Sequence, residues 1–376
     1  MTILMVDDNS VNLYVIENIL KKAGYKECHS LNSAEELFQF LQIDKEDGPT
    51  PDVDLILLDI MMPKIDGIEA CRRIQQVERL KEIPIIFLTA LNDSKNLVEA
   101  FEAGGTDYVT KPIDKLEFLA RIRVALRLKH EKDLNKEQEA KMKSDLLLAM
   151  QVQGSLLNDS IDEEFLSIQK FHRPSDNLSG DMYHWHKFSK HRYGIILFDI
   201  MGHGISASLV SMFISSVLRD AIKNLEDPIL VIKELNRNMT SLHKKNDLNY
   251  YLTATYLIID TEKQNIEYVN AGHPPGFLRI DGTLLPLERG ACAVGLFDEI
   301  DVKKFTVSYK EDIQLLLYTD GILEAEGVDE LETLEKLKKV TFQEWKDNES
   351  LFQVMLSDID QSKQKDDICL LMIKSK

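Results

Sequence analysis

The chain has 376 residues, of which 44% are hydrophobic and 29% are charged, and its formal net charge is −18 at pH 7. This length exceeds what one ordinary hydrophobic core organises and suits two domains with a connector. The acidic charge argues against binding to DNA or RNA, because a phosphate backbone needs a basic face.

Residues 1–125 alternate between apolar runs and helical spacing. The runs 3–6, 54–59, 83–90 and 107–112 predict strands, and the segments 11–23, 66–80 and 93–103 predict helices. Continuous apolar runs are typical of strands buried on both faces of a parallel sheet. The pattern therefore predicts a doubly wound α/β domain, in which ligands bind at the carboxyl ends of the strands.

Polar side chains follow these predicted strand ends: the acid pair Asp7–Asp8, then Asp59, Thr89, and Lys111 before Pro112. An acid cluster there would hold Mg²⁺ through oxygen ligands. Asp59 would then serve as a nucleophile that forms an acyl phosphate, and Lys111 and Thr89 would bind the phosphoryl oxygens. Taken alone, an acid pair at a strand-to-helix turn is more often a helix cap. The prediction therefore depends on the whole set.

The ordered motifs VDDN, LLDIMMPKIDG, LTA and YVTKP resemble the receiver domain of two-component response regulators over nearly all of residues 1–125. The resemblance implies a flavodoxin-like, five-stranded parallel sheet, Asp59 as the phosphoacceptor, and a histidine kinase as partner. It implies a cis peptide bond at Lys111–Pro112. The other positions that it implies are Asp7, Asp8, Asp59 and the Ile60 carbonyl as Mg²⁺ ligands, Thr89 and Lys111 as phosphate sensors, and Tyr108 as the aromatic switch.

Residues 114–158 predict a long helix that continues out of the first domain. The stretch 129–145 is densely charged and contains no proline or glycine, whereas 145–157 is amphipathic. A solvated spacer helix and a dimerising transmitter helix both remain open, because only a weak heptad supports the second. We predict a receiver domain at 1–125, a helical connector at 126–164 and a second domain at 165–376.

The second domain has shorter apolar runs with two-residue periodicity. These predict strands at 193–200, 251–260, 265–272, 302–309, 313–321 and 366–374, and a helical stretch covers about 205–245. Many such strands with few helices predict an α+β sandwich rather than another parallel sheet.

Aspartates of this domain recur at predicted strand ends or in glycine-rich turns: SGD (179–181), DIMGHG (199–204), NAGHPP (270–275), YTDG (318–321) and DDIC (366–369). Carboxylates that converge from separate strands can hold two divalent cations about 3.5–4 Å apart, which bind a phosphate monoester and ionise a water. Each aspartate alone is more often a turn or cap residue. His203 has no second histidine at zinc-ligand spacing, and His273 is interpreted as a packing or loop residue.

This order of motifs resembles the SpoIIE/RsbU branch of metal-dependent PPM (PP2C-like) phosphatases across about 165–376, and AMQVQGSLL resembles the regulatory helix of that branch. The resemblance implies an αββα sandwich that dephosphorylates serine or threonine with two Mn²⁺ or Mg²⁺ ions. Ser179 stands where this branch usually has glycine, and His184 and His186 stand where an acid is common. The implied metal ligands are Asp181, Asp199, the Ile200 carbonyl, Asp320 and Asp366, with Asp367 in reserve.

The whole architecture resembles the RsbY-type regulators of the Bacillus general stress response. This resemblance implies that phosphorylation of Asp59 activates dephosphorylation of a phosphorylated STAS-domain anti-anti-sigma factor, which switches on a stress sigma factor. It also suggests a homodimer through helix 114–158. The alternatives are a non-catalytic partner-binding regulator, a DNA-binding regulator, which the acidic charge disfavours, and a nucleotide cyclase, whose landmarks are not recognisable.

The remaining composition predicts a cytoplasmic protein. No run of about 18 apolar residues stands out as a membrane span, and the N-terminus lacks the basic and apolar regions of a signal peptide. The four cysteines, Cys28, Cys71, Cys292 and Cys369, lie far apart in the sequence. They form neither a metal-ligand spacing nor a disulfide framework, which suits a reducing compartment.

Overall fold

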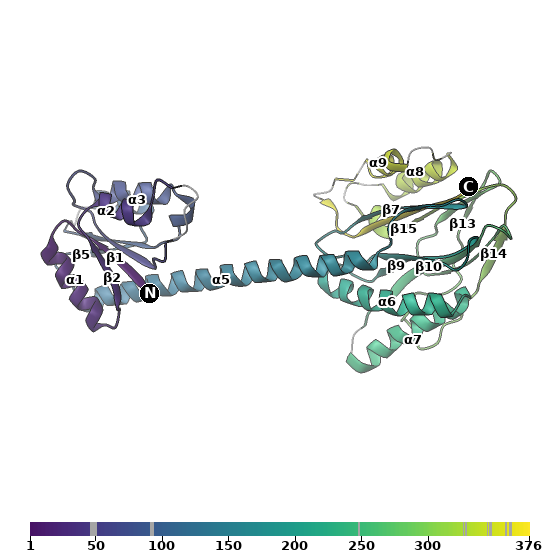
Figure 1. Cartoon of the computed structure of the whole chain (residues 1–376), viewed down its shortest axis with the longest axis horizontal. Coiled ribbons are helices and arrows are strands. Elements are labelled where there is room, and N and C mark those ends of the chain that lie inside the picture. Colours follow the sequence, from purple (N-terminus) through teal and green to yellow (C-terminus); the bar gives the residue numbers. More distant parts are fainter. Residues whose placement is uncertain are drawn as a thin grey trace. The chain divides into compact units, whose positions relative to one another are not determined.

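The computed structural model describes residues 1–45, 51–90, 94–246, 249–325, 327, 329–343, 345, 348–357, 359–360 and 363–376. The chain divides into two compact units, Met1–Lys143 and Ser144–Lys376. The predicted long helix is confirmed as α5 (Lys115–Leu156), which begins in the first unit and ends in the second (Figure 1). The predicted domain boundaries at 125 and 164 stay a prediction.

The first unit has a five-stranded parallel sheet, as predicted. Its strands are β1 (Thr2–Val6), β2 (Glu27–Leu31), β3 (Leu55–Asp59), β4 (Ile85–Thr89) and β5 (Asp107–Thr110), in the order β2-β1-β3-β4-β5. The helices are α1 (Ser10–Lys22), α2 (Ala34–Leu41), α3 (Gly67–Gln75), α4 (Ser94–Glu102), the short η1 (Glu78–Leu80) and the first part of α5.

Helices cover both faces of this sheet, which explains the continuous apolar runs. In β1, Ile3 and Met5 join the core formed with α1 and α5, whereas Leu4 and Val6 join the core formed with α2 and α3. Strand β2 did not stand out in the sequence, because its side chains are mostly exposed and it pairs only with β1 at the sheet edge. A strand of this kind has no apolar run to mark it.

The second unit contains two antiparallel sheets. The first has the order β14-β11-β10-β9-β8 and the second β13-β12-β15-β16-β7-β6. The strands are β6 (Ile161–Asp162), β7 (Leu166–Arg173), β8 (Met182–Lys187), β9 (Arg192–Ile200), β10 (Leu252–Asp260), β11 (Asn265–Ala271), β12 (Phe277–Ile280), β13 (Thr283–Pro286), β14 (Phe305–Ser308), β15 (Ile313–Tyr318) and β16 (Ile368–Ser375). The other elements are α6 (Gly204–Asn224), α7 (Pro228–Asn246), η2 (Asp320–Ile322), α8 (Glu330–Phe342) and α9 (Asn348–Met355).

These elements stack as four layers (Figure 1). One core lies between the two sheets and includes Ile195 and Leu371. A second core lies between the five-stranded sheet and the helices α6 and α7, and a third lies between the six-stranded sheet and α8 and α9. The predicted αββα sandwich is therefore confirmed.

The helical stretch predicted at about 205–245 forms two helices instead of one. Helix α6 ends at Asn224, and α7 begins at Pro228, whose ring cannot continue a helix but suits a first turn. By length and composition alone, α6 is apolar enough to cross a membrane, which the sequence reading did not single out. Half of its most apolar window is buried, and residues such as Ile214 and Leu218 pack in the core beneath the sheet.

Two candidate functional sites

The first candidate site lies at the carboxyl ends of the parallel strands in the first unit. Asp7 follows β1 and is fully buried, Asp59 ends β3 and is 5% exposed, and Asp8 is exposed. One ligand oxygen of each lies within 4.8 Å of the others, and no other group of three potential ligands comes so close in the described part of the chain. This all-oxygen cluster has the chemistry that Mg²⁺ prefers.

Lys111 partly neutralises this acidic cluster. Its Nζ lies 2.8 Å from Asp7 Oδ2 and 3.1 Å from Asp59 Oδ1. Burial raises the pKa of Asp59, Lys111 opposes that rise, and repulsion from Asp7 adds to it. Burial also acts to lower the pKa of Lys111, but the hydrogen bonds and charges of the two acids outweigh it, so the net shift is upward. One lysine cannot balance three carboxylates, which leaves negative charge for a cation to compensate.

The contacts around Asp7 show that the acid pair does not cap α1. The N-cap of α1 is Asn9, whose side chain accepts from Val11 N–H, so the capping interpretation of Asp7–Asp8 is wrong. Asp7 instead accepts from Asn9 N–H at 2.9 Å and from Asn12 Nδ2 at 3.1 Å. The sequence reading missed Asn12, although its place in the first turn after the acid pair was a usable signal.

The predicted phosphate sensors lie on neighbouring strands. Thr89 ends β4 and is 1% exposed, and Lys111 follows β5 with a cis bond to Pro112, as expected. Tyr108 lies in β5, edge-on to Phe101 at a centroid distance of 6.1 Å. Arg121 Cζ of α5 lies 5.6 Å from the Tyr108 ring centroid, so this ring contacts the long helix.

The Ile60 carbonyl, predicted as a metal ligand, already has a partner. It accepts a hydrogen bond from Gly67 N–H at 3.0 Å, and Gly67 comes so close that a Cβ there would lie 2.2 Å from Asp59 O. The Met61 backbone N–H, which the sequence reading did not single out, hydrogen-bonds to the Asp59 carboxylate. The segment after Asp59 is thus held against the acidic cluster by backbone contacts.

The second candidate site lies where the two antiparallel sheets end side by side. Asp181 directly precedes β8, Asp199 is the last residue but one of β9, Asp320 begins η2 after β15, and Asp366 stands two residues before β16. Asp181 is 1% exposed. Thr319 Oγ1 donates to Asp181 Oδ2 at 2.7 Å and accepts from Cys369 N–H at 2.8 Å, which ties three strands together beside the acids. The sequence reading missed this role of Thr319.

The acids of this site repel one another. Burial, and then repulsion from Asp199, raises the pKa of Asp181 well above its usual range. Burial and Asp320 act likewise on Asp199, and burial raises the pKa of Asp366 to about 6. Buried oxygen donors that destabilise each other's charge fit divalent cations, which would relieve the repulsion. Two cations can share four acids without three carboxylate oxygens meeting at a single point. This arrangement differs from the close cluster of Asp7, Asp8 and Asp59.

Two glycines let the backbone approach these acids. A Cβ on Gly180 would lie 3.2 Å from Ile200 O and 3.1 Å from Gly202 O, so both carbonyls face the SGD loop. A Cβ on Gly321 would lie only 2.0 Å from Asp367 O. The Ile200 carbonyl predicted as a ligand therefore lies beside the acidic loop.

Asp367 has both carboxylate oxygens engaged within the protein. Its Oδ1 accepts from Ser175 N–H at 2.6 Å and from Ser175 Oγ at 2.9 Å, and its Oδ2 accepts from Gly180 N–H at 2.7 Å. These bonds order the loop that carries Asp181. They favour Asp366 over Asp367 as the ligand, in line with the order of preference drawn from the sequence.

The two motif histidines have different surroundings. His203 is the exposed N-cap residue of α6. His273 is fully buried, and its Nδ1 lies 2.7 Å from Oγ1 of Thr253, the residue that pairs with Asp199 across β9 and β10. Burial lowers the pKa of His273 to about 3, so the ring is a neutral packing group that supports the neighbouring strand.

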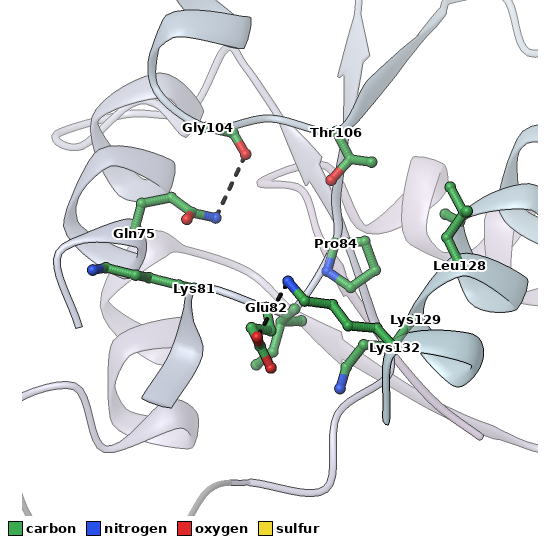
Figure 2. A pocket seen from close by; sticks show the side chains of 11 residues that line it. Gln75, Lys81, Glu82, Pro84, Gly104, Thr106, Leu128, Lys129 and Lys132 are labelled. Carbon is green, nitrogen blue, oxygen red and sulfur yellow. Dashed lines mark hydrogen bonds and ion pairs between the residues drawn. The ribbon is translucent and has the colours of Figure 1, made fainter. Parts of the chain in front are cut away.

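A separate cavity of about 210 Å³ lies at the opposite end of the parallel sheet, next to the start of β4 (Figure 2). Gln75 donates to the Gly104 carbonyl at 3.5 Å on one side, and Lys132 of α5 lies 3.2 Å from Glu82 on the other. Lys136 also pairs with Glu82. No predicted site residue lines this cavity, and its ion pairs hold α5 against the segment that leads into β4.

Comparison with known proteins places both parts of the chain. Residues 189–376 match the family described as Stage II sporulation protein E (SpoIIE), and residues 3–123 match the response regulator receiver domain. The chain is 39% identical over 184 residues to Phosphoserine phosphatase RsbP of Bacillus subtilis (strain 168), covering 48% of this chain and 46% of that protein. It is 30% identical over 189 residues to Phosphoserine phosphatase RsbU of the same organism, covering 50% and 55%.

The chain thus spans about half the length of these curated relatives. Among solved structures, the SiaA-PP2C domain of Pseudomonas aeruginosa has a similar fold, with a TM-score of 0.53 and 19% identity, over 62% of this chain and 97% of that domain. The family match over residues 189–376 and the similarity of fold point to the same kind of domain. The chain therefore belongs to the Stage II sporulation protein E (SpoIIE) family and carries a response regulator receiver domain ahead of its PP2C-like sandwich.

Proposed function

We propose that this protein is a metal-dependent protein serine/threonine phosphatase whose activity depends on phosphorylation of Asp59. The observation that carries the proposal is the convergence of four aspartates from both sheets, Asp181, Asp199, Asp320 and Asp366, at one end of the sandwich. Their mutual repulsion supports a role in binding cations rather than a role in turns. The similarity to two phosphoserine phosphatases supports the same reaction.

The chain's own residues would hold and orient the reacting groups. Thr319 fixes one oxygen of Asp181, and the loop between Ser175 and Gly180 is fixed by Asp367, so the ligand oxygens are arranged before substrate arrives. Two Mn²⁺ or Mg²⁺ ions bound there would supply the Lewis acidity that lowers the pKa of water and neutralises phosphoryl charge. Hydrolysis then needs no covalent enzyme intermediate.

The receiver supplies the control. With Mg²⁺ bound at Asp7, Asp8 and Asp59, a histidine kinase would phosphorylate Asp59, and Lys111 and Thr89 would bind the added phosphoryl oxygens. Tyr108 contacts Arg121 of α5, which gives the switch a route into the long helix. A shift of a two-state equilibrium from 1:99 to 99:1 requires about 5.5 kcal/mol. A new doubly charged group that contacts Lys111 and Thr89 would contribute to this free energy through charge-assisted hydrogen bonds.

We further propose a cytoplasmic homodimer that contacts its partner copy through α5. Leu128, Leu134 and Met142 are 53%, 42% and 63% exposed on this helix, which supports pairing of the helix with another apolar surface. The proposed substrate is a phosphorylated STAS-domain anti-anti-sigma factor, whose dephosphorylation would switch on a stress sigma factor. The receiver and phosphatase relationships support a kinase and a phosphoprotein as partners in general.

The test is hydrolysis of a phosphorylated STAS-domain protein and of p-nitrophenyl phosphate by the full chain with Mn²⁺, with and without beryllofluoride. We expect activity that changes with beryllofluoride in the wild type, is lost in Asp199→Ala, and no longer responds in Asp59→Ala. The matched control is Asp298→Ala, a surface acid paired with Lys244. Absence of hydrolysis of both substrates in both states would support the non-catalytic, partner-binding alternative.

A further inference from the structure

We propose that Arg173 and the apolar groove beside it recognise an acidic side chain of the phosphoprotein substrate. The inference rests on the proposed function and deepens it, because it names a feature of the substrate other than the phosphoryl group. The groove has a volume of about 650 Å³ and lies on the outer face of the six-stranded sheet, between the end of β7 and α9 (Figure 1).

The alternation of side chains along β7 places Arg173 on the face of the groove. Leu166 and Ile168 belong to the core between the two sheets. Phe171 packs on the opposite side, against the core formed with α8 and α9, and its ring centroid lies 5.8 Å from that of Phe352 in α9. Since successive side chains of a strand point to opposite faces, Arg173 shares the face of Phe171. The Arg173 Cζ accordingly lies 5.7 Å from the Phe171 ring centroid.

The guanidinium of Arg173 has hydrogen-bonding capacity that the protein leaves unused. Its Nε and Nη2 are buried and have no hydrogen-bond partner among the residues that the structure describes. On the same sheet, Arg279 Nη2 does have an acid, since it donates to Asp312 at 2.9 Å. Burial also lowers the pKa of Arg173, because it disfavours the charged form.

The two unused nitrogens match one kind of ligand. Nε and Nη2 form one edge of the planar guanidinium, and such an edge binds a carboxylate through two parallel hydrogen bonds. A buried donor without an acceptor is costly, so a carboxylate that accepts from both nitrogens relieves that cost. The Arg173 side chain is half-buried, and rotation about its terminal bonds can turn this edge toward the groove.

The rest of the groove is apolar and carries no acid among the residues that the structure describes. Its aromatic and aliphatic lining consists of Phe352, Leu356 and Ile359. Lys170 also borders it, but its Nζ lies 5.9 Å from the ring centroid of Tyr183, which belongs to the core between the sheets. Arg173 is therefore the cation that the groove presents. In a chain with a formal net charge of −18, this site favours a segment that places an acid beside an apolar side chain.

One substrate can reach both the groove and the candidate metal site. Arg173 pairs with Ile368 across β7 and β16, and Asp366 stands two residues before Ile368. Gln364 ties the two segments together, because its Nε2 donates to Arg173 O at 3.0 Å and to Asp366 O at 2.8 Å. Strands lie about 4.8 Å apart and rise about 3.3 Å per residue, so the Cα atoms of Arg173 and Asp366 are roughly 8 Å apart. With the length of the arginine side chain added, the acid of an extended substrate should stand about three to six residues from its phosphoserine.

The test measures hydrolysis of phosphoserine peptides by the full chain with Mn²⁺ and beryllofluoride. Each peptide carries a glutamate followed by a phenylalanine, placed at successive distances before or after the phosphoserine. A matched peptide has glutamine in place of the glutamate. The enzymes are the wild type, Arg173→Gln, Arg173→Glu and the control Arg237→Gln, which removes an exposed arginine paired with Glu234 in α7. Hydrolysis of p-nitrophenyl phosphate shows whether each enzyme is active.

We expect one or more spacings at which the wild type has a KM at least fivefold lower for the glutamate peptide than for the glutamine peptide, with kcat changed less than twofold. Arg173→Gln should lose this preference, and Arg173→Glu should instead prefer lysine at the same spacing. Arg237→Gln should keep the wild-type preference. A merely structural role of Arg173 would alter the hydrolysis of both peptides alike and leave their ratio unchanged.

The inference is overturned if the wild type hydrolyses p-nitrophenyl phosphate but prefers glutamate at no spacing, and the phosphatase proposal then stands. A preference that survives in Arg173→Gln overturns it as well. Wild-type enzyme that hydrolyses neither p-nitrophenyl phosphate nor any peptide refutes the proposed function and the inference with it. If thermal unfolding shows that Arg173→Gln does not fold, Arg173→Lys decides, because a lysine lacks the two-nitrogen edge and should lose most of the preference.

Discussion

Gly321 is the point at which the strand ends bearing Asp320 and Asp366 touch, and Gly321→Ala tests how tightly they pack. The new Cβ would lie 2.0 Å from Asp367 O and 2.9 Å from Asp367 C. Side-chain Cβ atoms do not approach a neighbour closer than about 3 Å, so the two segments must separate by roughly 1 Å. Overpacking of this kind costs about 1–3 kcal/mol.

The consequences can be measured separately. For a unit of this size, 1 kcal/mol lowers the melting temperature by about 2–4 °C, so we expect a decrease of about 2–12 °C. Metal–ligand distances tolerate only about 0.2 Å, so a shift of roughly 1 Å between Asp320 and Asp366 should also abolish Mn²⁺ binding. Calorimetry with and without Mn²⁺ measures both effects on the transition of the second unit.

Gly154→Ala is the matched control. Gly154 lies in α5 with nothing within 4 Å of an added Cβ. Alanine there should stabilise the helix by about 0.5–1 kcal/mol, because glycine loses more conformational freedom on folding. Our reasoning about the strand ends is refuted if Gly321→Ala melts at the wild-type temperature and binds Mn²⁺ normally.

Three further predictions concern other parts of the chain. Asp59→Asn should not be labelled by acetyl phosphate, because an amide cannot form the acyl phosphate, and a phosphate-affinity gel that still shows a shifted band would contradict this. Thr319→Val removes the donor to Asp181 and should destabilise the second unit by about 1–3 kcal/mol, measured by urea unfolding, with Thr319→Ser retaining most of the stability. Burial, aided by nearby cations, lowers the pKa of His184 to about 4 from 6.5. Below pH 6.5, His184 binds a proton in the unfolded chain but not in the folded chain. The free energy of unfolding should therefore fall by about 3 kcal/mol between pH 6.5 and 4, and by less in His184→Gln.

Much of the receiver could be predicted from the sequence, because its structure is encoded locally. Apolar runs such as 54–59 predict strands that are buried on both faces, and the carboxyl ends of parallel strands meet at one edge of the sheet. Asp7, Asp59 and Lys111 could therefore be placed together before any coordinates, and the contacts at 2.8 and 3.1 Å bear this out. Strand β2 could not be found in the same way, since an exposed edge strand has no such run.

In the second unit, the motifs alone marked the candidate aspartates, whereas the tertiary structure decided what each neighbouring residue contacts. Asp366 and Asp367 are adjacent in sequence, yet only Asp367 is saturated by the loop around Ser175, which lies 192 residues away. Thr319 reaches Asp181 across 138 residues, and Gln153 reaches Ser179 across 26. Spacing and periodicity report on residues within one element. Hydrogen bonds between distant segments depend on which strand ends the folded sheets bring side by side, and that is a property of the packed chain alone.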